Sequence, residues 1–339
     1  RSGDCEGSDQ LLCNPSPKGN LTMRNQRPLY PLLIALVMAI QPGPSQAQPN
    51  DVIVHADEGG WKLQVDGDDF MVFGMNWGYI PIGENYRYTL WDQSDEFIKQ
   101  AIEPEMALLR DMNVNAIRLF SDIPPRWVEY IYDHYGIMTA VNHLMGRYGF
   151  EVNGVFLSQT DYSDETTRQA ILDDLRDTVE SYKDTRGVLM YLLGNENNYG
   201  LSWTSFEIED LPEEAKDPRA EYLYSLMGEA ATLVSGMDER HPVAMVNGDI
   251  NYLDVIARTC GDLDIMGANV YRGGSSGDLF QRVADEMGVP FVYTEFGADA
   301  YDARRGREDD VSQAGYLLRQ WQEIYEQSHG KGGAGTAIG

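Results

Sequence analysis

Two glutamates in this sequence each follow a run of apolar residues. Glu196 comes at the end of Leu192-Leu193-Gly194-Asn195-Glu196, and Glu295 at the end of Val292-Tyr293-Thr294-Glu295. One such carboxylate can be a helix cap or an ion-pair partner. Two of them, 99 residues apart, are harder to explain structurally, because each stands where a buried strand would meet its loop.

A pair of carboxylates at the mouth of a sheet suits the cleavage of a glycosidic bond. One carboxyl group must be held protonated to donate to the leaving oxygen, and the other must stay ionised to attack the anomeric carbon. A separation of about 5–5.5 Å would give double displacement with retention of configuration. This chemistry therefore needs a sheet that holds both carboxylates at the same edge.

Seven apolar runs alternate with seven amphipathic stretches along residues 70–327. The runs predict strands at 70–77, 116–120, 138–142, 188–194, 243–247, 265–270 and 291–296. The stretches predict helices at 96–112, 126–135, 166–182, 220–237, 252–260, 279–287 and 310–327. Such βα units at even pitch favour an α/β protein whose parallel sheet is covered by helices.

Two closures of this sheet are possible, a doubly wound open sheet and a (β/α)8 TIM barrel. The first strand ends in Gly74-Met75-Asn76-Trp77-Gly78, which lacks a glycine-rich phosphate loop and so disfavours a dinucleotide-binding fold. Polar and aromatic residues end nearly every strand, as in barrel enzymes. We therefore expect a TIM barrel over 70–339, truncated in or just before strand eight, which would begin at 335–339.

Several strand ends together resemble the clan A glycoside hydrolases, and in particular the catalytic TIM-barrel domain of glycoside hydrolase family 2. The matching segments are Asn195-Glu196, Thr294-Glu295-Phe296-Gly297, Asn115-Ala116-Ile117-Arg118, Asn142-His143 and Asn269-Val270-Tyr271. The resemblance covers about residues 68–339. It departs from the family in having only a short hairpin region before the barrel, where the family carries sandwich domains.

This resemblance implies a role for each matched residue. Glu196 would be the acid/base and Glu295 the nucleophile, so the expected function is a retaining β-glycoside hydrolase acting on a β-linked oligo- or polysaccharide. Arg118 and Tyr271 would contact the nucleophile, and Asn195 would bind the sugar 2-hydroxyl. Substrate-binding roles are also implied for Asn142 and His143.

The residues themselves leave some of these roles open. Arg118 lies within an apolar strand and needs a buried anionic partner, because an unpaired buried charge is costly. Tyr271 can be a core aromatic, and His143 a satisfied core histidine. Three further residues, Asn76, Trp77 and Trp203, are candidates for stacking on or binding a sugar, although aromatic residues more often pack in a core.

Composition restricts the partners. The chain of 339 residues has 26 Lys+Arg against 54 Asp+Glu, a net charge of −28. Such a surface repels phosphate backbones and acidic lipids, so nucleic-acid and membrane-surface binding are disfavoured, whereas a carbohydrate partner is compatible with it. The five histidines are scattered and no His/Cys cluster has zinc spacing, so neither a metal nor a cofactor is predicted. Oligomeric state has no signature in the sequence.

The first residues look like a leader. A short basic stretch from Met23 precedes an uncharged apolar run at 29–40, and Ser45-Gln46-Ala47 then gives a small-x-small cleavage pattern. We expect a signal peptide at 23–47, a disordered segment upstream at 1–22, and a secreted or periplasmic product. Residues 48–69, with an Asp66-Gly67 turn, predict a β-hairpin extension.

Two other functions stay open from the sequence alone. A transglycosylase would use the same two glutamates, with a sugar hydroxyl replacing water in the second step. A non-catalytic carbohydrate-binding barrel belongs to another class; the loss of either glutamate would favour it, yet both are present.

Overall fold

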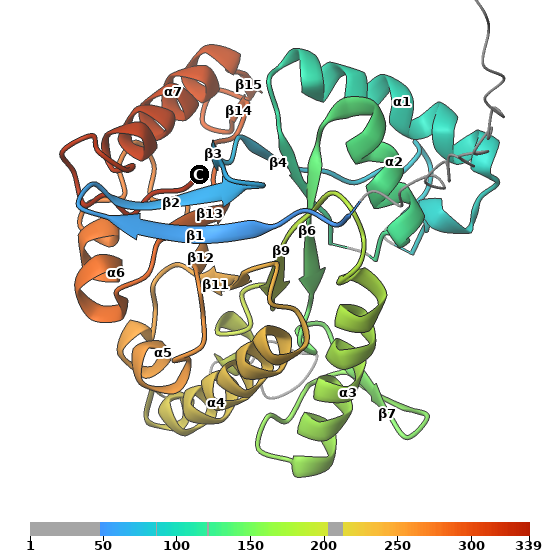
Figure 1. The fold of residues 1–339 in the computed structure, drawn as a ribbon, viewed down its shortest axis with the longest axis vertical. Coiled ribbons are helices and arrows are strands. Elements are labelled where there is room, and N and C mark those ends of the chain that lie inside the picture. Colours follow the sequence, from blue (N-terminus) through green and yellow to red (C-terminus); the bar gives the residue numbers. More distant parts are fainter. Residues whose placement is uncertain (1–47, 86, 121, 203–212) are drawn as a thin grey trace, which may run out of the picture. The chain divides into compact units, whose positions relative to one another are not determined.

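The computed structural model describes residues 48–85, 87–120, 122–202 and 213–339, so the predicted leader lies outside the described residues. Short parallel strands occupy the centre of this part of the chain and helices surround them (Figure 1). It is a mixed α/β fold. None of its helices, over the residues described, is long and apolar enough to span a membrane.

The parallel strands form two sheets. Their bounds are β4 (Gly74–Asn76), β5 (Ala116–Arg118), β6 (Met138–His143), β9 (Val188–Leu193), β10 (Val243–Met245), β11 (Asn247–Gly248), β12 (Met266–Asn269) and β13 (Phe291–Glu295). One sheet has the order β10-β9-β6-β5-β4 and the other β11-β12-β13. The described strands therefore do not pair as one closed sheet, because β10 and the segment before β12 share only an isolated bridge, between Ala244 and Ile265.

The helices follow the predicted stretches closely. They are α1 (Asp95–Asp111), α2 (Pro125–Tyr135), α3 (Glu165–Tyr182), α4 (Glu213–Met237), α5 (Leu253–Thr259), α6 (Leu279–Met287) and α7 (Asp310–Glu326). Capping fixes several of these ends. The side chains of Ser94, Asp164 and Asp309 accept hydrogen bonds from the first turns of α1, α3 and α7.

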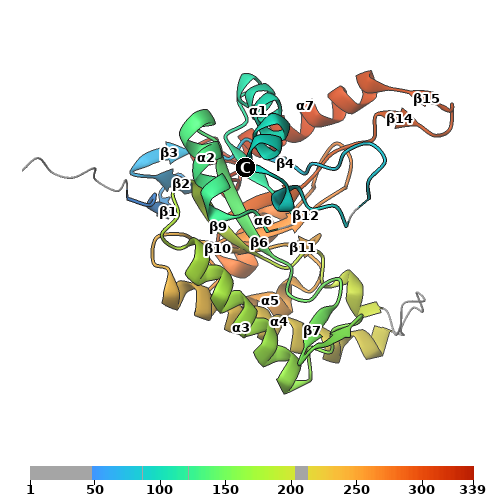
Figure 2. The same ribbon diagram turned by 90° about the vertical axis from the view of Figure 1, so that its right-hand side faces the viewer.

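The expected strand at 70–77 is divided. Phe70 ends β3 (Asp68–Phe70), which pairs antiparallel with β2 (Gly60–Val65), while β2 also pairs with β1 (Val52–Asp57). The Asp66-Gly67 turn joins β2 to β3, so the extension before the main fold is a three-stranded sheet. Figure 2 places this sheet at the end of the parallel strands opposite to the hairpin that contains β7.

The last residues of the chain lie beside β13. Phe291 N donates to Thr336 O (2.9 Å) and Tyr293 N to Gly339 O (2.9 Å), while Val72 N donates to Ile338 O (2.9 Å). The segment 336–339 therefore bonds to β13 on one side and to the residues before β4 on the other.

Two apolar clusters hold the layers together. The larger one lies between strands and helices and includes Ile102, Ile131 and Tyr191. The second joins inward residues of the strands, such as Leu192 and Val292, to the N-terminal sheet. Alternation along each strand supplies both clusters, since successive side chains point to opposite faces.

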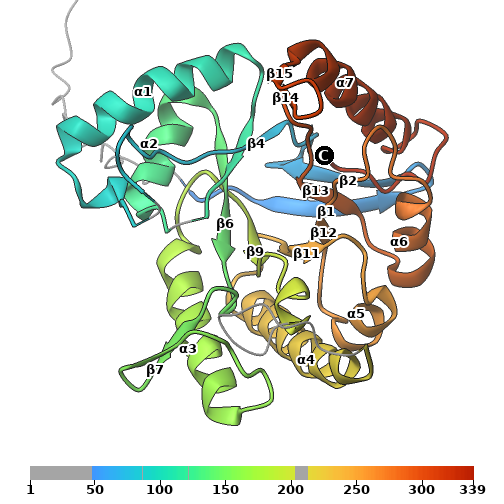
Figure 3. The same cartoon turned by 180° about the vertical axis from the view of Figure 1, so that it is seen from behind.

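Long loops follow the strands at the end seen in Figure 3. The loop after β6 contains the hairpin of β7 (Phe150–Val152) and β8 (Val155–Leu157), and the loop after β13 contains β14 (Tyr301–Asp302) and β15 (Arg307–Glu308). Two short 3-10 helices, η1 (Leu90–Asp92) and η2 (Tyr199–Ser202), follow β4 and β9. These loops frame the carboxyl ends of the strands, where the candidate residues meet.

Candidate active site

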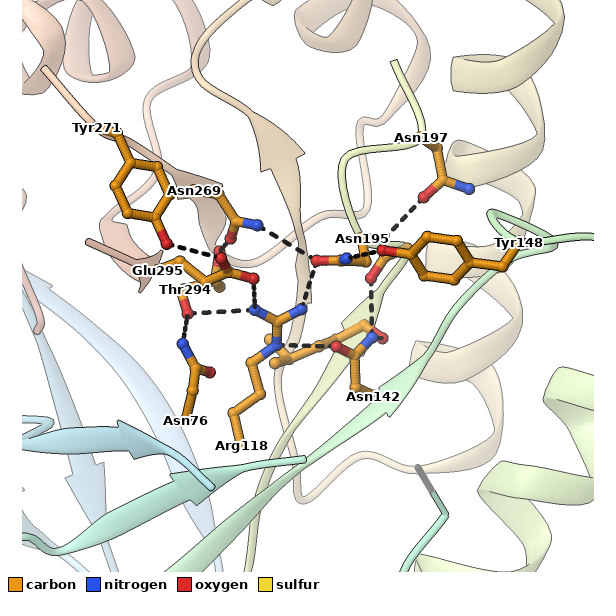
Figure 4. A network of polar contacts seen from close by, with 12 residues as sticks. Asn76, Arg118, Asn142, Tyr148, Asn195, Asn197, Asn269, Tyr271, Thr294 and Glu295 are labelled. Atoms are coloured by element: carbon orange, nitrogen blue, oxygen red, sulfur yellow. Dashed lines mark hydrogen bonds and ion pairs between the residues drawn. The ribbon is translucent and has the colours of Figure 1, made fainter. Parts of the chain in front are cut away.

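Arg118 is the centre of a polar network at the carboxyl ends of the strands (Figure 4). It ends β5 and is 5% exposed. Its Nη1 donates to Glu295 Oε1 (3.0 Å), Nη2 to Asn195 Oδ1 (2.8 Å) and Nε to Asn142 Oδ1 (2.9 Å). The planar guanidinium group thereby ties together the ends of four strands, β5, β6, β9 and β13.

The Glu295 carboxylate is held on both oxygens. Oε1 receives the bond from Arg118, and Oε2 receives a 2.9 Å bond from the Tyr271 hydroxyl. The Glu295 side chain is only 17% exposed. A bulge between Ala268 and Asn269 lets β12 pair with Glu295, which brings the residues after β12 close to this carboxylate.

Charge and burial act together on these groups. Burial lowers the pKa of Arg118, and the neighbouring Glu295 charge partly offsets this effect. An arginine nevertheless stays protonated at neutral pH. Burial raises the pKa of Tyr271 to about 12, with further contributions from its bond to Glu295 and from the charges of Glu295 and Glu196. Arg118 therefore donates to the Glu295 carboxylate as a cation, and Tyr271 donates to it as a neutral phenol.

Glu196 lies in a tight turn just after β9. Its backbone has a φ of 55°, in the left-handed region that non-glycine residues rarely adopt, and its N–H donates to Val246 O (2.9 Å). Its side chain is half-buried. The charge of Glu196 contributes to the pKa of both Arg118 and Tyr271, so it lies within electrostatic range of the Glu295 site.

The Glu196 turn is fixed by the asparagines beside it. Asn195 N donates to Asn197 Oδ1 (2.7 Å), and Asn142 Nδ2 donates to Gly194 O (2.8 Å). A side chain at Gly194, whose φ is 83°, would meet Asn197 Oδ1 at 2.6 Å. These contacts hold the Glu196 backbone in its strained conformation, and such strain is frequent at functional sites.

The structure brings most of the predicted residues into one network. Arg118, Asn142, Asn195, Tyr271 and Glu295 are joined by direct hydrogen bonds. The Nδ2 of Asn76 joins them through the carbonyl oxygen of Thr294 (3.1 Å), which also accepts from Arg118.

His143 and Trp77 lie on the other side of their strands. His143 Nε2 bonds to Asp174 Oδ2 of α3 (2.9 Å), and its Nδ1 accepts from Met145 N (3.3 Å). Trp77 is 6% exposed, belongs to the cluster between strands and helices, and donates from Nε1 to Glu105 Oε2 of α1 (3.2 Å). Neither is bonded to the network around Glu295. Trp203 lies outside the described residues.

Three members of the network were absent from the sequence prediction. Asn269 Nδ2 donates to Asn195 Oδ1 (3.3 Å), and Thr294 Oγ1 donates to Asn269 Oδ1 (2.7 Å). Both stand at strand ends, so the rule that selected Asn195 could have found them. The third, Tyr148, accepts from Asn195 Nδ2 (2.7 Å) and lies in the loop after β6, where that rule does not reach.

The space around the network includes a cavity of about 420 Å³. Its lining includes the polar residues Asn76, Arg118, Thr294 and Glu295, the phenol of Tyr293, and apolar residues such as Leu192, Val292 and Trp321. Among the described residues, no cluster of three or more His, Cys, Asp or Glu side chains could hold a metal ion. The polar side chains that line this space carry an amide, a guanidinium group, a phenol, a hydroxyl and a carboxylate.

Solved structures that superpose on this chain include β-glycosidases. A GH2 β-galacturonidase from Eisenbergiella tayi bound to galacturonate superposes with a TM-score of 0.56 at 15% identity, over 81% of this chain and 44% of the other. A β-glucuronidase from Bacteroides uniformis gives 0.58 at 14% identity, over 81% and 31%. The chain resembles the catalytic domains of glycoside hydrolase family 2.

Sequence comparison points the same way over a shorter stretch. A β-galactosidase from Arthrobacter sp. (strain B7) is 30% identical over 141 residues, which are 41% of this chain and 13% of that enzyme. No family model matches the sequence. The chain thus spans a small part of the curated relative and less than half of these GH2-like structures.

Proposed function

We propose that this chain is the catalytic part of a retaining β-glycoside hydrolase, with Glu295 as nucleophile and Glu196 as acid/base. The observation that carries the proposal is the pairing of Arg118 and Tyr271 on the two oxygens of Glu295. Two donors on one carboxylate fix its orientation, as attack on an anomeric carbon requires.

The two glutamates would divide the reaction into two steps. In the first, Glu295 attacks the anomeric carbon while Glu196 protonates the leaving oxygen, which gives a covalent glycosyl-enzyme. In the second, Glu196 removes a proton from water, and the water displaces Glu295. The carboxamide of Asn195, held by Arg118, would bind the sugar 2-hydroxyl.

The fold we propose for this activity is a (β/α)8 barrel. It is supported by the isolated bridge between Ala244 and Ile265, which links the two parallel sheets, and by segment 336–339, which bonds to both β13 and Val72. In such a barrel the catalytic groups come from the carboxyl ends of several strands, as do Glu196 and Glu295 here.

We propose a β-linked glycoside as substrate, without a cofactor. The names of the relatives, β-galactosidase, β-glucuronidase and β-galacturonidase, supply the first panel to try. The net charge of −28 argues against a nucleic acid. The leader suggests export with cleavage after Ala47, which N-terminal sequencing of the secreted product would test.

The decisive variant is Glu295→Gln, tested on the 4-nitrophenyl β-glycosides of that panel. The amide cannot form the glycosyl ester, so turnover should be abolished. The variant should still fold, with a lowered melting temperature, because the buried Arg118 cation loses its charged partner. Glu326→Gln, on the exposed face of α7, is the matched control and should keep full activity. If the unmodified chain turns over a glycoside and Glu295→Gln keeps this turnover, the assignment of Glu295 as nucleophile is refuted. Sugar binding without any turnover would favour the non-catalytic barrel.

The same experiment separates hydrolysis from transglycosylation. With an added acceptor sugar, a hydrolase should still release mainly free monosaccharide, whereas a transglycosylase should form the elongated product. Chromatography of the products distinguishes the two outcomes.

A further inference from the structure

The carboxamide of Asn195 has a nearly complete set of protein partners. Its Oδ1 accepts from Arg118 Nη2 (2.8 Å) and from Asn269 Nδ2 (3.3 Å), which uses both lone pairs. One Nδ2 hydrogen goes to the Tyr148 hydroxyl (2.7 Å). The described residues offer no acceptor for the second Nδ2 hydrogen, so it is available to a ligand.

Tyr148 differs from the other partners of Asn195 in its surroundings. Its side chain is 59% exposed, whereas Arg118 and Asn269 are buried. Because its hydroxyl oxygen accepts from Asn195, the hydroxyl hydrogen is left to donate. A ligand that reaches Asn195 would therefore also come within reach of this phenol.

The loop that carries Tyr148 is constrained on both sides. Residues Met145 and Gly146 have φ of 51° and 71°, and Gly149 has a φ of 96°. A side chain at Gly149 would meet the Phe156 ring of β8 at 2.5 Å, so the chain packs tightly on the β7–β8 hairpin. The guanidinium carbon of Arg147 lies 5.1 Å from the centre of the Tyr148 ring.

We propose that Tyr148 is a positioning residue for Asn195, acting on the sugar 2-hydroxyl through the Asn195 carboxamide. This inference rests on the proposed function. Arg118 and Asn269 fix the oxygen side of the amide, and Tyr148 fixes its nitrogen side. Without the phenol, one Nδ2 hydrogen loses its partner and the other is no longer held toward the ligand.

The test compares Tyr148→Phe with the unmodified chain on two substrates, 4-nitrophenyl β-D-galactoside and its 2-deoxy analogue, or the corresponding pair for whichever glycoside of the panel is turned over. On the 2-hydroxy substrate we expect kcat/KM to fall about three- to tenfold, the size of one neutral hydrogen bond. On the 2-deoxy substrate the fall should be less than about twofold, because the hydroxyl that Asn195 binds is gone. In an Asn195→Ala background, Tyr148→Phe should have no further effect on either substrate.

Tyr325→Phe is the matched control. Tyr325 is 58% exposed and also carries a cation near its ring, Lys331 Nζ at 4.8 Å, but it lies on α7 and makes no contact with Asn195. It should leave both substrates unaffected.

The outcomes are distinct. Unchanged activity in Tyr148→Phe, or an equal loss on the 2-hydroxy and 2-deoxy substrates, would overturn the role of Tyr148 while leaving the glycosidase intact. Absence of turnover in the unmodified chain would instead reject the proposed function, and this inference with it.

Discussion

Arg118→Met removes the charge at the centre of the network and keeps much of the buried side-chain volume. Glu295 Oε1 and Asn142 Oδ1 would lose the only hydrogen-bond partner that the described residues give them. The other two acceptors, Asn195 Oδ1 and the Thr294 carbonyl, each keep one further donor. The damage is therefore concentrated on one carboxylate and one amide.

These losses set the size of the effect. Breaking a buried ion pair by removing one partner costs about 3–5 kcal/mol, and a buried amide oxygen left unpaired costs about 1–3 kcal/mol. The 17% exposure of Glu295 lets water recover part of this. We expect the free energy of unfolding at pH 7 to fall by about 3–5 kcal/mol, against a typical total of about 5–15 kcal/mol.

Urea unfolding at pH 7 measures this loss of stability. The control is Arg126→Met, whose ion pair with Asp95 is exposed on both sides and should contribute less than about 1 kcal/mol. A loss no larger than that of the control would contradict this expectation.

Three further variants test two other residues of the site and one ion pair outside it. Glu196→Ala should keep much of its glycosylation rate on substrates with good leaving groups, and added azide should restore deglycosylation. Steady-state kinetics measure both effects, and the absence of rescue by azide would contradict the acid/base role. Tyr271→Phe removes a hydrogen bond from the Glu295 carboxylate and should lower kcat by about 10- to 100-fold. A kcat equal to that of the unmodified chain would contradict this role of Tyr271. The pKa of Asp174 is lowered mainly by its hydrogen bond from His143, so its contribution to stability is present above the ordinary carboxyl range and lost as pH falls through the lowered pKa. Asp174→Asn should thus lower the melting temperature at pH 7 and have little effect near pH 2, and an equal effect at both would count against this pair.

Much of the fold could be predicted from apolar runs and helix boundaries. The run 188–194 contains β9 because all six residues of that strand are buried on both faces. The start of α1 follows from the Ser94 cap. The prediction of one strand at 70–77 was wrong because the local pattern does not show which neighbour a strand will pair with. The chain reverses at Asp66-Gly67, so that Phe70 pairs with Leu63, and only Gly74–Asn76 join the parallel sheet.

The same alternation of side chains explains which candidate residues meet. Neighbouring residues in a strand point to opposite faces, so Asn142 reaches Arg118 while His143 reaches α3. Asn76 and Trp77 divide in the same way. The sequence motif Asn142-His143 names both residues, but strand geometry lets only one of them face the network.

Tyr148 was beyond sequence reasoning for a different reason. It stands five residues past the end of β6, in a loop whose path depends on positive φ angles at Met145 and Gly146 and on packing of Gly149 against the β7–β8 hairpin. No periodicity predicts such a path. Tyrosines in loops are common, and only the three-dimensional position of Asn195 distinguishes this one.

Trapping the covalent intermediate would show directly whether Glu295 is the nucleophile. A 2-deoxy-2-fluoro β-glycoside with a good leaving group, of the sugar that the chain turns over, slows both steps and lets the glycosyl-enzyme accumulate. Peptide mass spectrometry should then find the fluorosugar on Glu295, and no such adduct should form in Glu295→Gln. A fluorosugar found on another residue, or continued turnover of the natural glycoside with no ester to any carboxylate, would contradict the account.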